Sequence, residues 1–195
     1  FRRVLFRSPQ IPKTPLLYFV VSLVNRGNSL LVIILFRMPG PKLYYFDMYA
    51  AAEAIRMTLW HAKVEFEDIR LSWEEQQKLK AEGKFPAGQV PCMETPDGRM
   101  WNQSNAILHF LGAKHGLYGS DADLETRYWA DWAIETHNDL WGNGYYQAFF
   151  ADDMNEELHK KTVEKAATFI HALQKRLSHN GDKHYFGGDH MTIGD

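Results

Sequence analysis

The sequence has a single cysteine, Cys92, among its 195 residues. One cysteine cannot form an intramolecular disulfide framework, which fits a reducing compartment. The chain also lacks the Cys-x-x-Cys pair of a dithiol oxidoreductase, because residues 47–50, directly after the first expected strand, read Asp-Met-Tyr-Ala. Cys92 itself follows a proline in a short expected strand, and this favours a buried thiol over a nucleophile.

Metal, phosphate and membrane motifs are missing as well. The nine histidines are scattered, with no His-Glu-x-x-His and no His/Cys cluster, so we expect no metal site. Residues 181–188 are rich in glycine but lack the spacing of a phosphate-binding loop. No apolar run reaches the ~20 residues that a membrane-spanning helix needs. We therefore expect no membrane partner.

Acidic residues are absent before Asp47, whereas six basic residues lie in that part of the chain. The formal net charge of −2 hides this asymmetry: residues 38–195 carry 24 acidic residues against 16 basic ones, a charge of −8. This net negative charge over residues 38–195 argues against nucleic acid as a partner.

The first 37 residues differ from the rest of the chain. Residues 1–8 resemble the translation of a sequencing-library adapter, and two apolar runs come next, at 16–24 and 30–36. Neither run spans a bilayer, and together they would bury Arg26. A signal peptide is the alternative for this basic and apolar segment, although a small-residue cleavage site is missing. We interpret residues 1–37 as a non-native leader and expect the natural protein to begin near Met38.

Regular patterning begins after this leader. We expect strands at residues 42–46, 64–71, 92–95 and 99–101, and helices at residues 50–62 and 105–114. Pro-Asp-Gly at 96–98 predicts a hairpin turn, and Gly116 ends the second helix. A connection rich in lysine, glutamate and glutamine follows the second strand. Its charged stretch, residues 74–84, is expected to be either a solvated helix or a loop. The order βαβ then ββα predicts a thioredoxin-like domain at residues 38–116.

Strand patterns vanish in the remainder of the chain. Helices are expected at 124–139 and 156–179, the second with one apolar face. Thr192 fits the N-cap of a further helix, with Asp195 at the third position and the preceding methionine as a hydrophobic staple. Because the chain stops there, we expect residues 117–195 to be an all-helical domain that is C-terminally truncated. The fold class is therefore α+β.

The most informative functional signal is a short segment before the hairpin, Gln89-Val90-Pro91. An X-Pro bond beside a strand can be held cis, which turns the Val90 backbone outward to pair with an extended ligand. After the hairpin, Gln103 and Ser104 open an apolar helix, whose free N–H groups and dipole attract a carboxylate. Taken singly, Gln-Val-Pro would mark only a strand end, and Ser104 an ordinary N-cap.

Together these features resemble the glutathione transferase family, closest to its sigma-like class, over residues 38–195. The matching segments are Leu43-Tyr44-Tyr45-Phe46, Ala52-Glu53-Ala54-Ile55-Arg56, Trp73, Gly88-Gln89-Val90-Pro91, Gln103-Ser104-Asn105-Ala106-Ile107 and Gly188-Asp189-His190-Met191-Thr192-Ile193-Gly194-Asp195. Each motif is weak alone, but six in the same order are specific. The resemblance implies a cytosolic homodimer that activates glutathione as co-substrate and takes a small electrophile.

Tyr45 matches the catalytic tyrosine of that family. A thiol with a pKa near ~8.5 is mostly protonated at neutral pH, although the thiolate is the nucleophile. A phenol that donates its O–H to sulfur stabilises the thiolate, so the resemblance implies that Tyr45 is a hydrogen-bond donor and not a base. By position alone, a tyrosine near a strand end is more often a packing residue.

The resemblance also implies how glutathione is held. Gln103 and Ser104 match the residues at its γ-glutamyl end, and Gln89-Val90-Pro91 matches the clamp on its cysteinyl unit. Val90 contributes backbone groups there, and Pro91 is the cis-proline.

Two further regions match the ends of the ligand. Trp73 and a nearby lysine, Lys78 or Lys80, match the side that meets the glycyl carboxylate, although an insertion blurs the register. Asp139 lies near the position that reaches across the dimer toward the ligand's amino group. A solvated helix acid is the alternative for Asp139.

One position departs from the pattern. Sigma-like members carry an arginine close to the tyrosine O–H, and this chain has Ala51 there. Loss of a cation beside a developing thiolate removes part of its electrostatic stabilisation. The expected reaction is conjugation of the thiol to electrophiles, as in detoxification, with peroxide reduction or isomerisation, including prostaglandin-type isomerisation, as related options. A carrier or crystallin-like protein that binds glutathione or apolar ligands without useful catalysis is the alternative.

Overall fold

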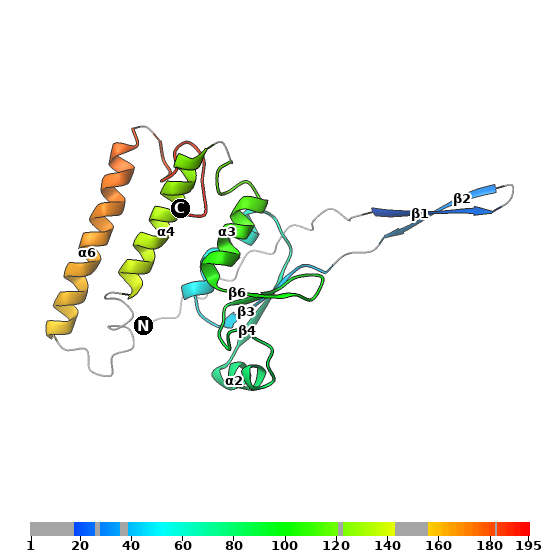
Figure 1. The fold of residues 1–195 in the computed structure, drawn as a ribbon, viewed down its shortest axis with the longest axis horizontal. Helices are drawn as coiled ribbons and strands as arrows, with labels where there is room; N and C mark the ends of the chain where they lie inside the picture. Colours follow the sequence, from blue (N-terminus) through cyan, green and yellow to red (C-terminus); the bar gives the residue numbers. More distant parts are fainter. Residues whose placement is uncertain (1–17, 26–27, 36–38, 121–122, 143–155, 182) are drawn as a thin grey trace, which may run out of the picture. The chain divides into compact units, whose positions relative to one another are not determined.

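The structure is a computed structural model that describes residues 18–25, 28–35, 39–120, 123–142, 156–181 and 183–195 (Figure 1). The chain forms two compact units, residues 1–107 and 108–195, and the boundary falls inside one helix.

The first unit contains a four-stranded sheet. Its strands are β3 (Lys42–Phe46), β4 (Glu67–Leu71), β5 (Cys92–Glu94) and β6 (Met100–Asn102), in the spatial order β4-β3-β5-β6. β3 and β4 are parallel, with Tyr45 opposite Arg70, whereas β5 pairs antiparallel with both β3 and β6. The crossover between β3 and β4 contains a 3₁₀ turn, η1 (Ala50–Ala52), and the helix α1 (Glu53–His61), while α3 (Ser104–Lys114) follows β6. This arrangement confirms the expected thioredoxin-like order of elements.

The two faces of β3 carry different side chains because successive residues of a strand alternate. Tyr44 packs on one face in a cluster with Leu71, Phe85 and Cys92. Tyr45 lies on the other face, where α1 places the guanidinium of Arg56 5.9 Å from the centre of the Tyr45 ring.

The charged stretch after β4, for which the sequence left a solvated helix or a loop open, is helical over most of its length. Helix α2 (Trp73–Ala81) begins with a capping box, in which the Glu75 amide donates to Ser72 Oγ at 3.1 Å. In return, the Ser72 amide donates to the Glu75 carboxylate at 2.7 Å. This reciprocal pair satisfies two backbone donors at the helix start, which propensity alone does not reveal.

The expected hairpin turn and the expected end of the second helix are both confirmed. The Gly98 amide donates to the Thr95 carbonyl at 2.8 Å, and Gly98 has a φ of +83°, a conformation that favours glycine. Gly116 ends α3 with a φ of +74°.

The two apolar runs of the N-terminal segment form a hairpin. β1 (Tyr18–Asn25) and β2 (Asn28–Leu35) pair antiparallel over their whole length, from Tyr18 opposite Leu35 to Asn25 opposite Asn28. They make a two-stranded sheet of their own, separate from the sheet of β3 to β6.

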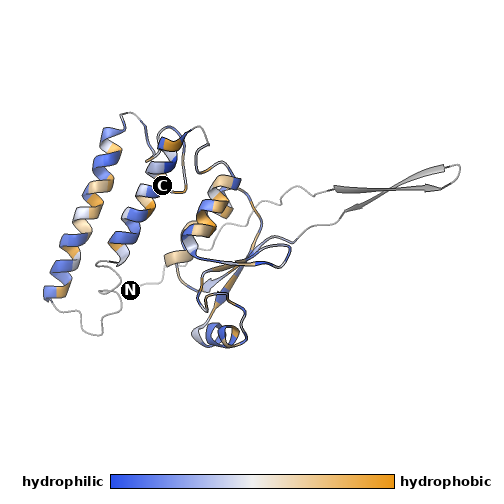
Figure 2. Cartoon of the chain, in the orientation of Figure 1, coloured by the Kyte–Doolittle hydropathy of each residue, from blue (hydrophilic) through white to orange (hydrophobic). Residues whose placement is uncertain are grey.

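The described residues of the second unit contain the end of α3, two further helices and an irregular segment at 183–195. α4 (Leu124–Leu140) and α6 (Glu156–His179) lie side by side (Figure 1) and match the expected helices. Figure 2 shows α6 as mainly hydrophilic with hydrophobic residues interspersed, and none of its residues is buried.

The end of the chain contains the expected cap-like motif. The Asp195 carboxylate accepts hydrogen bonds from the amide of Thr192 at 2.7 Å and from its hydroxyl at 3.0 Å. Among the described residues, no helix is both long and apolar enough to cross a membrane.

Candidate functional site

The segment before β5 has the backbone geometry expected of a peptide-binding ledge. The Val90–Pro91 peptide bond is cis, as the sequence predicts. Gln89 is exposed, Val90 is half-buried and Pro91 is buried. Within the described part of the chain, the backbone of Val90 makes no hydrogen bond, so its N–H and C=O can pair with an extended ligand.

Tyr45 lies on β3, one residue before the end of that strand. Its side chain is largely enclosed, with 8% of the residue's surface exposed. Burial raises the pKa of the phenol above its ordinary value of 10, while a hydrogen bond with the backbone of Ala51 and the charge of Arg56 act in the opposite direction. A raised pKa keeps the phenol protonated at neutral pH, which is the state that donates a hydrogen bond.

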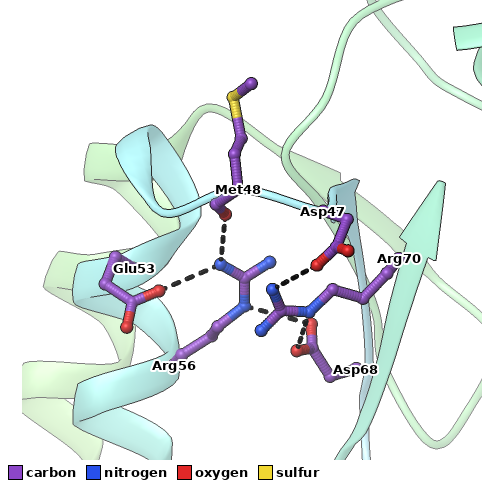
Figure 3. A network of polar contacts seen from close by, with 6 residues as sticks. All are labelled: Asp47, Met48, Glu53, Arg56, Asp68 and Arg70. Carbon is purple, nitrogen blue, oxygen red and sulfur yellow. Dashed lines mark hydrogen bonds and ion pairs between the residues drawn. The ribbon is translucent and has the colours of Figure 1, made fainter. Parts of the chain in front are cut away.

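Arg56 is a feature of this site that the sequence reasoning missed. Its Nε donates to Asp68 at 3.1 Å, and its Nη1 donates to the carboxylate of Glu53 at 3.0 Å and to the carbonyl of Met48 at 2.9 Å. Figure 3 shows Arg56 held between these three groups. The place of Arg56 in a motif shared with the family could have marked it as part of the site. Its partners could not be read from the sequence, because they depend on the register of β3 and β4.

A second arginine completes this network. Arg70 donates from Nε to Asp68 at 2.8 Å and from Nη1 to Asp47 at 2.9 Å. Asp68 is therefore shared between two guanidinium groups (Figure 3). The network ties α1 and the segment after β3 to β4.

The start of α3 differs in detail from the expectation. The carbonyl of Gln103 accepts from the amide of Ile107 at 3.0 Å, so Gln103 occupies the N-cap and Ser104 is the first helical residue. Gln103 is exposed and has a φ of +69°, which is unfavourable for a residue with a side chain. Non-glycine residues held in this region cluster at ligand sites.

Trp73 and β3 are linked by aromatic contacts. The Trp73 ring stacks on Phe46 with centroids 6.0 Å apart and planes 19° apart, and Phe46 in turn meets the Tyr45 ring at 5.6 Å. Trp73 remains 64% exposed. It therefore offers a flat, accessible apolar surface close to the end of β3.

The two candidate lysines differ in position on α2. A Cβ added to Gly88 would lie 3.1 Å from Lys80 Cε, so the Lys80 side chain runs against the residue directly before the ledge. This proximity favours Lys80 over Lys78.

All predicted site residues except Asp139 belong to the first unit. Asp139 is exposed on α4 in the second unit. A cavity of about 670 Å³ in that unit is lined by Arg176 near the end of α6, by Gly119, Ser120 and Asp123, and by the segment 187–192, and it contains none of the predicted site residues.

The environment of Cys92 agrees with the burial expected from the sequence. The Cys92 thiol is fully buried, and burial raises its pKa to about 11. It donates to the Gln89 carbonyl at 3.1 Å and is not a nucleophile in this state. The described residues contain no group of three or more metal-ligating side chains.

Comparisons with known proteins point to one family. A match to the glutathione S-transferase N-terminal domain covers residues 50–114. The chain is 36% identical over 149 residues to glutathione S-transferase A4 of Mus musculus, which covers 75% of this chain and 66% of the mouse protein. It is 32% identical over 164 residues to glutathione S-transferase 4 of Caenorhabditis elegans, covering 81% of this chain and 76% of that protein.

A solved structure agrees with these relatives. Prostaglandin synthase D of Nilaparvata lugens superposes with a TM-score of 0.69 at 30% identity, covering 80% of this chain and 76% of that chain. The chain spans about two thirds of the length of the mouse relative.

Proposed function

The chain belongs to the glutathione S-transferase family, and on that premise we propose that it activates the thiol of glutathione through Tyr45 and conjugates it to small electrophiles. The observation that carries this proposal is the cis Val90–Pro91 ledge, with an unpaired Val90 backbone, in the same unit as Tyr45 and the start of α3. This unit offers a place for an extended tripeptide and a donor for its sulfur.

Binding begins with the backbone. The cysteinyl unit of glutathione pairs with the N–H and C=O of Val90, in the manner of a short added strand. Its γ-glutamyl carboxylate lies at the start of α3, where Gln103 and Ser104 and the free amides of the first turn face a negative charge. Its glycyl end lies toward Trp73 and Lys80.

The chemical step needs a thiolate. The protonated phenol of Tyr45 donates to the sulfur, which favours loss of the thiol proton to solvent. The thiolate then attacks an electrophilic carbon, a carbon–sulfur bond forms, and the leaving group of an aryl halide departs as halide. Because only 8% of Tyr45 is exposed, this role depends on access of the thiol to that hydroxyl.

The wider assignment follows the same premise. We place the chain in the sigma-like class, as a cytoplasmic homodimer in which Asp139 reaches toward the ligand of the partner subunit. The name of the Nilaparvata lugens neighbour, a prostaglandin synthase, supports isomerisation as a related activity.

A binding protein with weak catalysis is the second candidate. Two observations favour it: Ala51 provides no cation beside the phenol, and Tyr45 is largely enclosed. Such a protein would hold glutathione or an apolar ligand on the same ledge and turn over slowly.

A glutathione-resin pull-down combined with an aryl-halide conjugation assay tests both candidates. We expect retention of the protein on the resin and turnover that falls about tenfold to a hundredfold in Tyr45→Phe, since the variant loses a hydrogen bond to a charged sulfur. Tyr128→Phe, an exposed tyrosine on α4, is the matched control and retains activity.

The outcomes separate the candidates. Retention without turnover supports the carrier, turnover unaffected by Tyr45→Phe removes the assigned donor, and absence of retention contradicts both.

A further inference from the structure

Among the residues that the structure describes, Arg56 is the charged neighbour that acts on the ionisation of the Tyr45 phenol. Burial of Tyr45 opposes the phenolate, and the charge of Arg56 favours it. The guanidinium carbon lies 5.9 Å from the ring centroid, within the range at which a cation and an aromatic ring attract each other.

Arg56 cannot move away from this position without breaking several contacts. Its side chain is 8% exposed and is anchored by Asp68, Glu53 and the carbonyl of Met48. These anchors come from β4, from the preceding turn of α1 and from the segment after β3. A cation fixed in this way is oriented before any ligand arrives, which is the condition for an efficient electrostatic effect.

The anchors leave part of the guanidinium without a partner. Nε and Nη1 are hydrogen-bonded, whereas Nη2 is buried and has no acceptor in the described part of the chain. A buried donor without an acceptor costs about 1–3 kcal/mol, so Nη2 does not add to the structural role of the other two nitrogens.

The network around Arg56 has three carboxylates against two guanidinium groups, a net charge of −1, and its negative charge is shared between the two arginines. Asp68 also binds Arg70, whose other nitrogen binds Asp47, so the negative charge of Asp68 is divided between two cations. The network holds the carboxylates Asp47, Glu53 and Asp68 and the two arginines (Figure 3). Of these five charged groups, Arg56 is the one that acts on the Tyr45 phenol.

We propose that Arg56 is a positioning residue of the thiol-activating centre: from α1 it supplies the fixed positive charge beside Tyr45 that the chain lacks at Ala51. This inference rests on the proposed function, because it assigns to Arg56 a part in the activation that Tyr45 performs. Arg56 acts through the phenol and does not contact the thiol. Its charge makes the O–H a stronger donor and thereby favours the thiolate.

The test measures the phenol directly. The pKa of Tyr45 is obtained without glutathione from ultraviolet titration of each protein against the same protein carrying Tyr45→Phe. In Arg56→Met the pKa of Tyr45 rises, and kcat/KM at neutral pH falls about threefold to tenfold as the pH profile moves to higher pH. Arg56→Lys keeps the charge and recovers part of both quantities.

A second variant, Glu53→Gln, keeps the test valid if Arg56→Met does not fold. Arg56→Met leaves Glu53 without its partner and Asp68 with Arg70 alone, and it can fail to fold. Glu53→Gln keeps Arg56 in place and removes a compensating charge, so it lowers the pKa of Tyr45, the opposite direction. Arg99→Met removes one arginine from the exposed β5–β6 turn and is the matched control, with no change in the pKa of Tyr45.

The outcomes keep this inference separate from the proposed function. An unchanged Tyr45 pKa in Glu53→Gln and in folded Arg56→Met overturns it, even where Tyr45→Phe abolishes turnover. If Tyr45→Phe leaves turnover intact, the proposed function fails instead, and any shift of the phenol pKa is then a property of the fold without a catalytic consequence.

Discussion

Two adjacent tyrosines of β3 show how one residue type takes two different environments. The hydroxyl of Tyr44 donates to Glu94 at 2.7 Å, and Lys84 binds the same carboxylate oxygen at 2.8 Å. Tyr45 faces the other side of the strand, toward Arg56, with no carboxylate among the groups that shift its pKa. Strand alternation thus separates a structural phenol from the candidate donor.

The Tyr44 side predicts an acid-dependent stability. Hydrogen bonds from Lys84 and Tyr44 hold the pKa of Glu94 below its ordinary value of 4.5. A carboxyl whose folded-state pKa is depressed contributes stability that is complete above the unfolded-state pKa and is lost as pH falls through the folded-state pKa. We expect Glu94→Gln to lower the free energy of unfolding by about 1 kcal/mol at neutral pH and by less in acid.

Urea unfolding followed by circular dichroism at several pH values between about 7 and 3 measures this difference, over the range in which Glu carboxyls titrate. Glu67→Gln, which breaks an exposed pair with Lys42, is the control and changes stability little. An acid dependence identical in Glu94→Gln and the unmodified protein contradicts the assignment.

The single thiol gives a second prediction at this scale. With a pKa of about 11 and no exposed surface, Cys92 presents almost no thiolate at neutral pH. We expect no reaction with a disulfide reagent in the folded protein and one equivalent in denaturant. Rapid labelling of Cys92 in the folded protein would show that the β5 segment opens. A mixed disulfide between Cys92 and the resin could then contribute to retention on glutathione resin.

At the scale of elements, α2 shows where sequence patterns are insufficient. Most of its residues have charged or amide side chains and show no apolar periodicity. The hydropathy pattern therefore does not distinguish a helix from a loop there. The signal that decides it is local: Ser72 and Glu75 have the spacing of a capping box. The helix matters for the site because it begins with Trp73.

Removal of the cap tests this link between α2 and the ligand. Ser72→Ala loses the hydrogen bond to the Glu75 amide, which costs about 1 kcal/mol of local helix stability. We expect faster amide exchange in α2 and weaker glutathione binding, because Trp73 is held less firmly. Ser178→Ala, at an exposed serine of α6, serves as the control with unchanged exchange in α2. Protection of α2 that does not change would show that packing, and not the cap, fixes this helix.

The sequence predicted those parts of the site that depend on local chemistry. The cis bond before Pro91, the turn at Gly98 and the bounds of α6 follow from residues close together in the chain. The network of Arg56 was not predictable in the same way, because Asp68 and Arg70 reach it only through the parallel register of β3 and β4. The enclosure of Tyr45 is likewise a property of packing.

At the scale of the whole molecule, the strands β1 and β2 belong to a different sheet from β3 to β6. β1 and β2 pair only with each other, whereas β3 to β6 form a complete sheet without them. A two-stranded hairpin is marginally stable alone. Its sequence, rich in valine, leucine and isoleucine, is also the kind that pairs edge to edge with other chains.

Deletion of residues 1–37 therefore removes an association-prone sheet and no strand of the thioredoxin-like fold. We expect the shortened protein to keep its far-ultraviolet helical signal and its retention on glutathione resin, and to show less aggregation by light scattering. Its formal charge changes from −2 to −8, since six basic residues are lost and no acidic one, and this further favours solubility. As a control, replacement of the six basic residues by glutamine in the full chain changes the charge alone. If the shortened protein loses retention while that control keeps it, the N-terminal segment supports the ligand site, and its interpretation as a dispensable leader is wrong.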